Sequence, residues 1–439
     1  MKRMKTTITF LFLLLTALLV GCNHHIENDG DIGPELAQEL WQKHMDALRM
    51  NDADRQCVAK INDLAFSMLH QIGENLLDSS FIVSPLGLAS VIAILGNGTQ
   101  DGTRDEIELV VGPIAKANAF FKKYSDALPH NDYTDCQLLN YLAINSALPI
   151  NDEFLKSVSS NYNACAKILD FAKAKSDKQV NEWFSRQSKD KLTTAIDELA
   201  PVSALFVIDS LLYNALWAQS FDKENTENRD FITDYGDTLL LPMMYNYYTS
   251  DNDISTQTFY CEGEDYQAVS LPYGGSCYRM LVVLPKSSKL REFIASMDRE
   301  KYTRILNTFQ KDKMFDLSLS LPRFECDSKF NLTAFVEEMM PRAFDFQKAD
   351  FSAISKIPTI IHDIRQKSNI QVTESKTKAV SITVVEQWIE TGLEDEPKEL
   401  IFTANHPFLY FVYDEATHAI LLMGQFCGDG AIFDREEYL

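Results

Sequence analysis

The segment TESKTKAVSITVV, residues 373–385, has the pattern of a strand with one face made only of small side chains. Successive side chains of a strand point to opposite faces. One face of this segment therefore carries Thr377, Ala379, Ser381 and Thr383. Such a strand can slide between two existing strands, because its inner side chains need little space in a packed core. No proline lies between Pro358 and Pro397, so every amide of the segment can donate to a neighbouring strand.

The residues that follow predict an exposed loop and then a buried strand. Residues 386–399 are polar, acidic and turn-like, and an apolar strand pattern begins at Leu400 in LIFTANHPFLYFVYD. The chain thus has an insertable strand, an exposed loop and a buried strand in that order.

This order, with these residues, resembles the serpin family. Glu374 matches the glutamate that opens the reactive-loop hinge in that family, and HPFLYF at 406–411 matches the strand after the loop. Further motifs similar to those of the family occur in order between residues 60 and 428: FIVSPL at 81–86, VNEWF at 180–184, LWAQSF at 216–221, LPMM at 241–244, LPYG at 271–274, LSLPRF at 319–324 and ILLMG at 420–424. Each motif is weak alone, but together and in register they indicate the fold.

The resemblance implies an α+β serpin fold with three β-sheets, about nine helices and an exposed reactive-centre loop, formed by residues 56–429. It also implies a suicide-substrate inhibitor of serine endopeptidases, and it leaves cysteine endopeptidases open as targets. The protease attacks the loop as substrate and forms an acyl-enzyme. The freed hinge then inserts into the central sheet and traps the protease before the ester is hydrolysed. We expect the protein to act as a monomer.

The start of the chain predicts a targeting segment. Lys2, Arg3 and Lys5 precede an apolar run too short for a comfortable membrane span, and this run ends at Cys22 in LVGC, which resembles a bacterial lipobox. Residues 1–21 are predicted to be a lipoprotein signal peptide, with Cys22 as the lipidated residue. The alternative is an ordinary secretory signal with an accidental cysteine.

The predicted organisation continues with a polar tether at 22–55, which includes a short helix at 35–50, and ends with a C-terminal tail at 430–439. A lipid-anchored protein with this leader is expected in the bacterial cell envelope, on the outer membrane or cell surface, facing outside or the periplasm. The lipid anchor is the only membrane contact that we predict.

Composition excludes several classes of function. The net charge of −22 and the lack of a basic patch argue against nucleic-acid binding. Eight cysteines leave seven beside Cys22, and none are spaced as Cys-x-x-Cys, so neither a zinc site nor thioredoxin-like chemistry is predicted. The chain has no Gly-x-Ser-x-Gly or His-Glu-x-x-His motif. We therefore predict no metal, no cofactor and no enzymatic activity.

The position of the cleaved bond follows from the resemblance. Serpins commonly place this bond about sixteen residues after the hinge glutamate, which gives Glu390–Thr391 here. Counting back from Pro407 gives a later position, so the predicted window runs from Trp388 to Glu396 and includes Ile389, Gly392, Leu393 and Glu394.

The window contains no lysine or arginine, so a trypsin-like protease finds no suitable residue in it. Glu390 suits a glutamate-preferring protease, and Leu393 or Trp388 suits a chymotrypsin-like or elastase-like one. Ile389 before Glu390 suits cysteine proteases that select the preceding apolar residue.

Two departures from the family pattern concern the hinge and the point where the sheet opens. Lys376 stands where inhibitory members usually have glycine, although the inward face that begins at Thr377 remains small. The family's polar cluster beneath the opening sheet is matched by Ser84, Gly87, Asp209 and Gln366, with Trp217 completing the predicted sheet-opening region. We expect Asp209 to accept a hydrogen bond from Ser84 or Gln366, since a buried carboxylate needs donors.

A second hypothesis keeps the fold without inhibition. A serpin-fold protein can instead serve as a binding or carrier module or as a sacrificial substrate. Proline or bulky residues on the inward face of the hinge would favour this hypothesis, and the hinge has none. A protease bound covalently in boiling detergent distinguishes inhibition from clean cleavage.

Overall fold

The computed structural model describes residues 32–76, 78–173, 175–189, 192–249, 257–286, 289–309, 315–374 and 398–433. These residues form two short 3-10 helices, η1 (Lys223–Asn225) and η2 (Pro341–Phe344), and the α-helices α1 (Pro34–Ala47), α2 (Asp52–Asn75), α3 (Pro85–Gly96), α4 (Asp101–Val111), α5 (Ile114–Ala127), α6 (Asp152–Tyr162), α7 (Ser176–Gln187), α8 (Leu290–Ser296), α9 (Arg299–Thr308) and α10 (Thr333–Met339). The sequence predicted about nine helices, and ten α-helices lie in this part of the chain.

A six-stranded sheet forms the centre of the core. Its order is β1 (Phe81–Val83), β15 (Ile420–Phe426), β14 (Phe408–Asp414), β9 (Tyr278–Pro285), β8 (Tyr266–Pro272) and β7 (Phe259–Glu262). Every residue of β9, β14 and β15 is buried, because both faces of these strands are covered. The buried strand predicted from Leu400 is confirmed only for β14, because residues 400–403 belong to a separate edge strand in which Ile401 is exposed.

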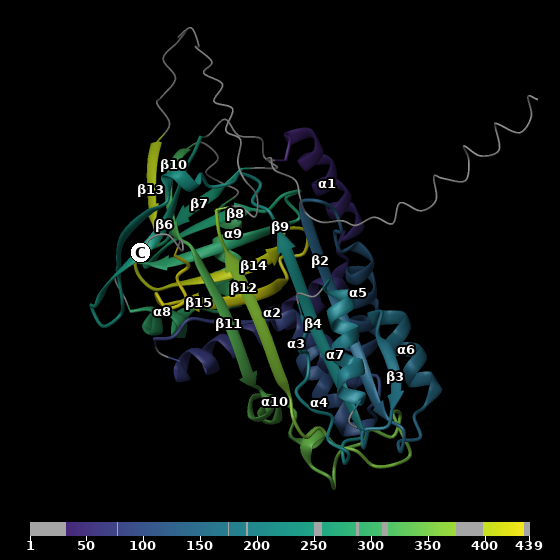
Figure 1. Ribbon diagram of the computed structural model, residues 1–439. Helices are drawn as coiled ribbons and strands as arrows, with labels where there is room; N and C mark the ends of the chain where they lie inside the picture. Colours follow the sequence, from purple (N-terminus) through teal and green to yellow (C-terminus); the bar gives the residue numbers. More distant parts are fainter. Residues whose placement is uncertain are drawn as a thin grey trace, which may run out of the picture.

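A four-stranded sheet lies beside it, at the end of the molecule where β13 begins (Figure 1). Its order is β13 (Lys398–Thr403), β10 (Phe315–Pro322), β6 (Thr238–Tyr248) and β5 (Glu227–Ile232). β10 pairs with β13 in parallel and with β6 antiparallel. The strand that follows the predicted reactive loop therefore enters this sheet at its edge.

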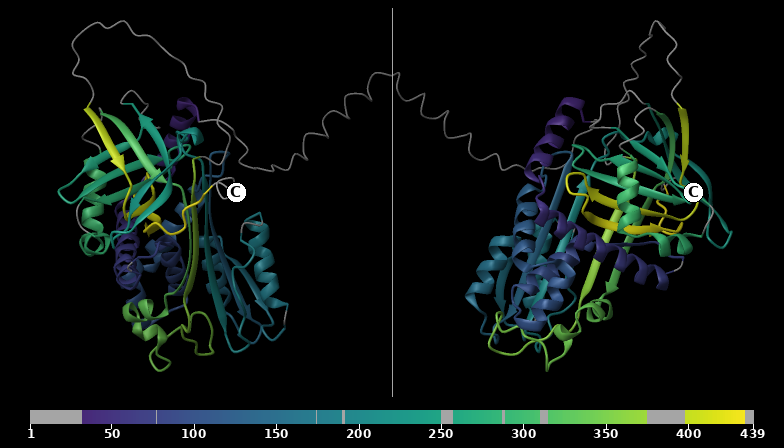
Figure 2. Two further views of the ribbon diagram at one scale, coloured as in Figure 1. Left: turned by 60° about the vertical axis from the view of Figure 1, so that its left-hand side comes forward. Right: turned by 180° about the vertical axis from the view of Figure 1, so that it is seen from behind.

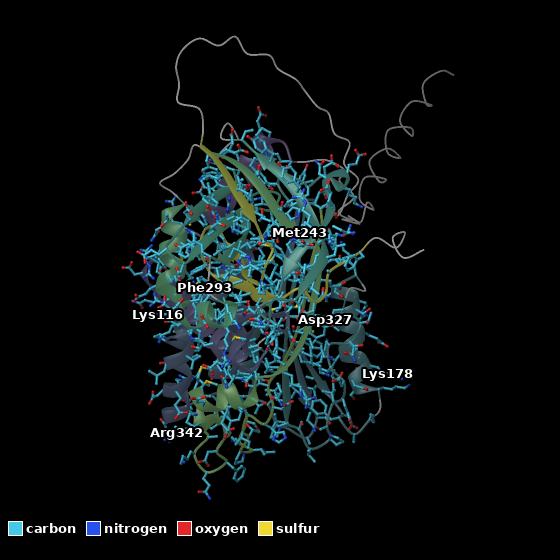
Figure 3. All side chains as sticks on the ribbon, turned by 90° about the vertical axis from the view of Figure 1, so that its left-hand side faces the viewer. Lys116, Lys178, Met243, Phe293, Asp327 and Arg342 are labelled. Carbon is cyan, nitrogen blue, oxygen red and sulfur yellow. The ribbon has the colours of Figure 1, made fainter. Side chains whose placement is uncertain are left out.

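Two smaller sheets run side by side along the molecule (Figure 2). One has three strands in the order β3 (Cys165–Leu169), β2 (Thr134–Asn145) and β4 (Leu205–Ala215), and the other pairs β11 (Phe324–Asn331) with β12 (Arg365–Val372). Helix α7 packs on one face of the three-stranded sheet through Val180 and Phe184, and the opposite face joins the main core. On β11, Asp327 lies on the exposed face, as Figure 3 shows.

The predicted large central sheet is open along its middle. β4 pairs with β2 and β12 pairs with β11, but within the described ranges no strand ladder joins β4 to β12. All residues of β4 are partly exposed, whereas those of its neighbour β2 are mostly buried. This boundary, which we call the seam, explains why the described strands form four hydrogen-bonded sheets where the sequence predicted three.

Helix α3 lies beneath the seam and starts at Ser84. The Ser84 side chain accepts a hydrogen bond from the Gly87 amide, and Pro85 occupies the first turn, as is favourable at a helix N-terminus. The helix is apolar around most of its circumference, and ten of its twelve residues are buried. The start of α3 is therefore a rigid base against which both sides of the seam can rest.

Helix α1 is the short helix that the sequence predicted at 35–50. Its buried His44 places Nε2 2.8 Å from Asp414 Oδ2, at the end of β14. Ala37 packs in a small apolar cluster with Ile32 and Ala218. The segment directly before the main domain is thus packed against it. No helix among the described residues is long and apolar enough to cross a membrane.

Candidate functional site

The hinge end of the seam is the place where the chain leaves β12 at Glu374. Trp217, which follows β4, donates its indole Nε1–H to the Thr373 carbonyl at 2.8 Å. The amide of Phe221 donates to the Glu374 carbonyl at 3.0 Å. These contacts join the C-terminal ends of β4 and β12, so the two strands run parallel on either side of the seam.

The Glu374 side chain is buried, with about 2 % of its surface exposed, and it is neutralised by a cation. Its Oε1 lies 3.2 Å from Arg323 Nη1 and accepts a hydrogen bond from Thr226 Oγ1 at 2.8 Å. Arg323 is itself buried, at the start of β11. Removing one partner of such a pair leaves an uncompensated buried charge, which costs about 3–5 kcal/mol. Glu374, the predicted start of the hinge, is therefore firmly held.

Aromatic rings fix the indole of Trp217. Its ring stacks on that of Tyr273, with centroids 4.4 Å apart and planes at 8°, and meets Phe221 edge-on at 5.9 Å. A ring held on two sides points its N–H in one direction. The donor to the Thr373 carbonyl is thus preorganised.

A second polar cluster surrounds the start of α3. Gln366 on β12 accepts a hydrogen bond from the Ser84 amide and donates one to the Ser84 carbonyl, both at 2.8 Å. The Ser84 hydroxyl donates to the Leu421 carbonyl at 2.9 Å. One side of the seam is therefore fastened to α3 through a full pair of amide hydrogen bonds.

Asp209 reaches the same helix from the other side of the seam. Its Oδ2 is buried and has no hydrogen-bond partner. Burial raises the pKa of Asp209 to about 7. A β-carbon added at Gly87 would clash with Asp209 Oδ1, so the glycine at this position makes room for the carboxyl group.

The hydrogen bonds predicted for Asp209 are wrong for this oxygen. Gln366 uses both ends of its side-chain amide on the backbone N–H and C=O of Ser84, and the Ser84 hydroxyl donates to the Leu421 carbonyl. A primary amide can accept from the N–H and donate to the C=O of one residue, whereas a carboxylate can only accept. The carboxyl group of Asp209 is thus left with an oxygen that no donor reaches.

Asp197 crosses the seam on the outer face of the sheets. It lies in the connection from α7 to β4, and it forms ion pairs with Lys329 on β11 at 2.8 Å and Lys367 on β12 at 3.2 Å. Hydrogen bonds from these two lysines lower the pKa of Asp197. Because all three side chains are solvated, these ion pairs contribute little to the stability of the contact across the seam.

The predicted site residues thus divide into groups. Ser84, Gly87, Asp209 and Gln366 come together at the start of α3, whereas Trp217 lies with Glu374 at the hinge end. The predicted hinge residues Lys376, Thr377, Ala379, Ser381 and Thr383 lie outside the described residues. So do the predicted bond Glu390–Thr391 with its window and the predicted lipidation site Cys22.

Sequence reasoning assigned no role to Arg323 or Thr226. Arg323 was visible in LSLPRF as part of a strand motif only. The usable signal was that a buried glutamate needs a cation and that an arginine precedes a strand of the same sheet.

Metal and thiol chemistry find no support at this site. No group of three or more metal-binding side chains occurs in the part of the chain that the structure describes. The cysteines at 57, 136, 165, 261, 277, 326 and 427 are all free thiols. Six of these seven are buried, and burial raises the pKa of Cys57 and Cys136 to about 12, so these two stay protonated and unreactive.

The sequence of the chain matches a known protein family. The family model described as "Serpin (serine protease inhibitor)" matches residues 59–428. An uncharacterised serpin-like protein of Methanosarcina mazei is 27% identical over 443 residues, covering 97% of this chain and 98% of its own. Serpin B6 of Pongo abelii is 25% identical over 374 residues, covering 82% of this chain and 96% of its own.

Solved structures share the fold. The thermophilic serpin tengpin in its native state superposes with a TM-score of 0.72 at 20% identity, covering 86% of this chain and 95% of its own. Human thyroxine-binding globulin in complex with its hormone also reaches a TM-score of 0.72, at 21% identity, over 86% of this chain and 100% of its own. The chain therefore shares its fold with these two proteins.

Proposed function

This chain belongs to the serpin family, and from that premise we propose that it is a suicide-substrate inhibitor of serine endopeptidases. Cysteine endopeptidases are the second candidate target class. In this role the protein is cleaved as a substrate and traps the protease, and it catalyses no reaction itself. Its partner is the target endopeptidase, and the reactive segment lies between Glu374 and β13.

The observation that carries the proposal is the seam between β4 and β12. These strands run parallel, and each has an edge without a strand partner among the described residues. The chain leaves β12 at Glu374, at the C-terminal end of both strands. If it turned back along the seam, it would run antiparallel to both neighbours and could pair with both. The small inward face that begins at Thr377 fits such a position.

The free energy available from this insertion is substantial. On the order of ten new ladder hydrogen bonds, at a net ~1 kcal/mol each, would form together with apolar burial. The segment from Ser375 to Glu390 in strand conformation spans about 53 Å at about 3.3 Å per residue. Insertion of that length would carry an attached protease along the whole sheet.

The chemistry begins with an ordinary proteolytic attack. The protease nucleophile adds to a loop carbonyl, and the peptide C–N bond breaks as the leaving amine takes a proton. An acyl bond then joins the loop to the protease. Insertion must outrun hydrolysis of this bond by water, so the outcome depends on the rates of the two steps.

The second candidate function is that of a non-inhibitory serpin-fold protein, serving as a binding module or a sacrificial substrate. The observation that favours it is Lys376, which stands where inhibitory members usually have glycine. Glycine lowers the barrier to a tight backbone turn, and lysine lacks that freedom. Thyroxine-binding globulin is a fold relative whose structure contains a bound hormone.

The proposed location is the bacterial cell envelope, with Cys22 as the lipid anchor and residues 23–31 as the start of the tether. Globomycin, an inhibitor of the lipoprotein signal peptidase, tests this proposal in the native host. Processing that stops in its presence supports the anchor. A mature chain that starts elsewhere and dissolves without detergent contradicts it.

A panel of proteases tests inhibition itself. Elastase-, chymotrypsin-, subtilisin-, glutamate-specific and papain-like enzymes are incubated with the protein and boiled in detergent. An inhibitor leaves a covalent complex with at least one of them, and mass spectrometry of the released fragment locates the cut between Trp388 and Glu396. Clean cleavage by every enzyme, with no complex, supports the second candidate.

A further inference from the structure

We infer that the C-terminal tail, residues 430–433, is a positioning element for the hinge. Through Arg323 it holds Glu374 in place and so sets how readily the hinge leaves its resting position. This inference rests on the proposed function, since the hinge must move for the trap to work. The tail lies just beyond the residues that the family model matches, which end at 428.

The tail pairs antiparallel with the edge of β11 that faces away from β12, through one isolated bridge. The Glu325 amide donates to the Gly430 carbonyl at 2.9 Å, and the Ile432 amide donates to the Arg323 carbonyl at 3.0 Å. Between these bonds, Ala431 is bridged to Phe324. The tail is thus attached to the backbone on both sides of the residue that opens β11.

The same tail also contacts the guanidinium group of Arg323. The Ile432 carbonyl accepts from Arg323 Nε at 2.8 Å, while Nη1 of the same group lies 3.2 Å from Glu374 Oε1. A guanidinium is planar and rigid, so fixing Nε also fixes the direction of Nη1. The Arg323 amide is held in turn by the Pro242 carbonyl at 2.9 Å. The tail therefore aims the cation that neutralises the hinge glutamate.

Gly430 allows the tail to approach this closely. It adopts φ +82°, a region that residues with a side chain rarely occupy, and a β-carbon there would clash with the Glu325 carbonyl. The residue is exposed, so a substitution displaces the tail without opening the core. This position offers a way to move the tail while keeping its length.

The experiment compares two truncations with the full-length protein. Deleting residues 430–439 removes the tail, and deleting 434–439 is the matched control that keeps it. Each intact protein is held at mild heat, and the fraction whose loop resists subtilisin is followed with time as a measure of spontaneous insertion. We expect the first truncation to convert about tenfold faster or more, because a hydrogen bond to a charged group is lost. The control should convert at the full-length rate.

A double-mutant cycle with Glu374→Gln separates hinge positioning from general support. If the tail acts through Arg323 and Glu374, the truncation adds less than about twofold in that background. Gly430→Val provides a single-residue variant if the deletion does not fold, and it should also convert faster. Equal rates for Gly430→Val and the full-length protein overturn the inference. So does an undiminished truncation effect in the Glu374→Gln background, or a control that converts as fast as the tail deletion.

The failure of this inference is distinguishable from that of the proposed function. Full-length protein cleaved in the loop must unfold at a higher temperature than intact protein if insertion occurs at all. Where that gain is absent, the proposed function fails and the tail inference fails with it. Where the gain is present but the tail variants convert at the full-length rate, only the tail inference fails.

Discussion

The hinge end of the seam and the start of α3 each bury a carboxyl group between the two sides of the seam, but only the hinge end supplies it with partners. At the hinge end, hydrogen bonds from Trp217 and Phe221 join the two sides of the seam, and the buried Glu374 side chain is paired with Arg323 and Thr226. Near α3, Gln366 is fully paired, but Asp209 keeps a buried oxygen without a donor.

This difference indicates which end of the seam stabilises the intact protein and which end destabilises it. If the segment after Glu374 inserts as proposed, the buried ion pair of Glu374 resists its movement. A buried acid without a partner destabilises the intact protein when it ionises. We infer that the contacts of Glu374 set the barrier to insertion of the following segment. We also infer that Asp209, at the start of α3, contributes to the instability that insertion relieves.

The largest effect is expected from Glu374→Ala. Arg323 would then stay buried without its partner, which should lower the free energy of unfolding of the intact protein by about 3–5 kcal/mol. Urea denaturation monitored by circular dichroism measures this quantity. Thr226→Val is the matched control, because it removes only one neutral donor and should cost about 1 kcal/mol. If both variants lose the same free energy of unfolding, the ion pair between Arg323 and Glu374 does not stabilise the hinge end more than a neutral hydrogen bond does.

Asp209→Asn, at the start of α3, is expected to raise the free energy of unfolding, whereas Glu374→Ala lowers it. The pKa of Asp209 is about 7 in the folded protein, against an ordinary value of 3.8 for an aspartic acid in water. Its contribution to stability is therefore full below about pH 4, declines as the pH rises toward 7 and stays lost above that.

At pH 8 the asparagine variant should be more stable than the parent by up to roughly 4 kcal/mol, and the difference should shrink toward zero near pH 4. Urea denaturation at several pH values measures it. A difference that does not depend on pH would contradict a buried, unpartnered carboxyl group. Glu325→Gln, on the exposed face of β11, is the control for a lost charge alone.

Gly87→Ala sharpens the contrast at the same position. The added methyl group collides with the Asp209 carboxyl group, which should cost roughly 1 kcal/mol after the better helix propensity of alanine is deducted. In an Asp209→Ala background the same change should be neutral or stabilising. A cost that persists in that background would place the crowding elsewhere.

The smallest effect is expected from Asp197→Asn. Its two ion pairs are solvated, so the loss should be below about 1 kcal/mol and should disappear in 1 M salt. Denaturation at low and high salt measures this loss, and an effect that salt leaves unchanged would contradict solvated ion pairs.

Most of the fold could be predicted because many short motifs occur in the right order between residues 60 and 428. The same register predicts Glu374 as the start of the hinge, and the structure shows its side chain in a buried ion pair. Its partner Arg323 could not be paired with it, because their contact depends on how β11 and β12 approach one another in three dimensions.

Backbone contacts were beyond prediction for a similar reason. The carbonyl of Ile432 leaves no trace in residue type, and only Gly430, in the tail predicted at 430–439, hints at a close approach. The partner expected for Asp209 was wrong because the Gln366 amide pairs with both the backbone N–H and the backbone C=O of Ser84. Donors could be counted from the sequence, but their directions could not.

The most direct test of the account is the thermal unfolding of intact protein against protein cleaved once between residues 375 and 397, followed by circular dichroism. If the intact form holds unused free energy in an open sheet, the cleaved form should unfold roughly 10 °C higher or more. Equal unfolding temperatures, with the cut verified by mass spectrometry, would contradict the account, because cleavage would then have completed no sheet.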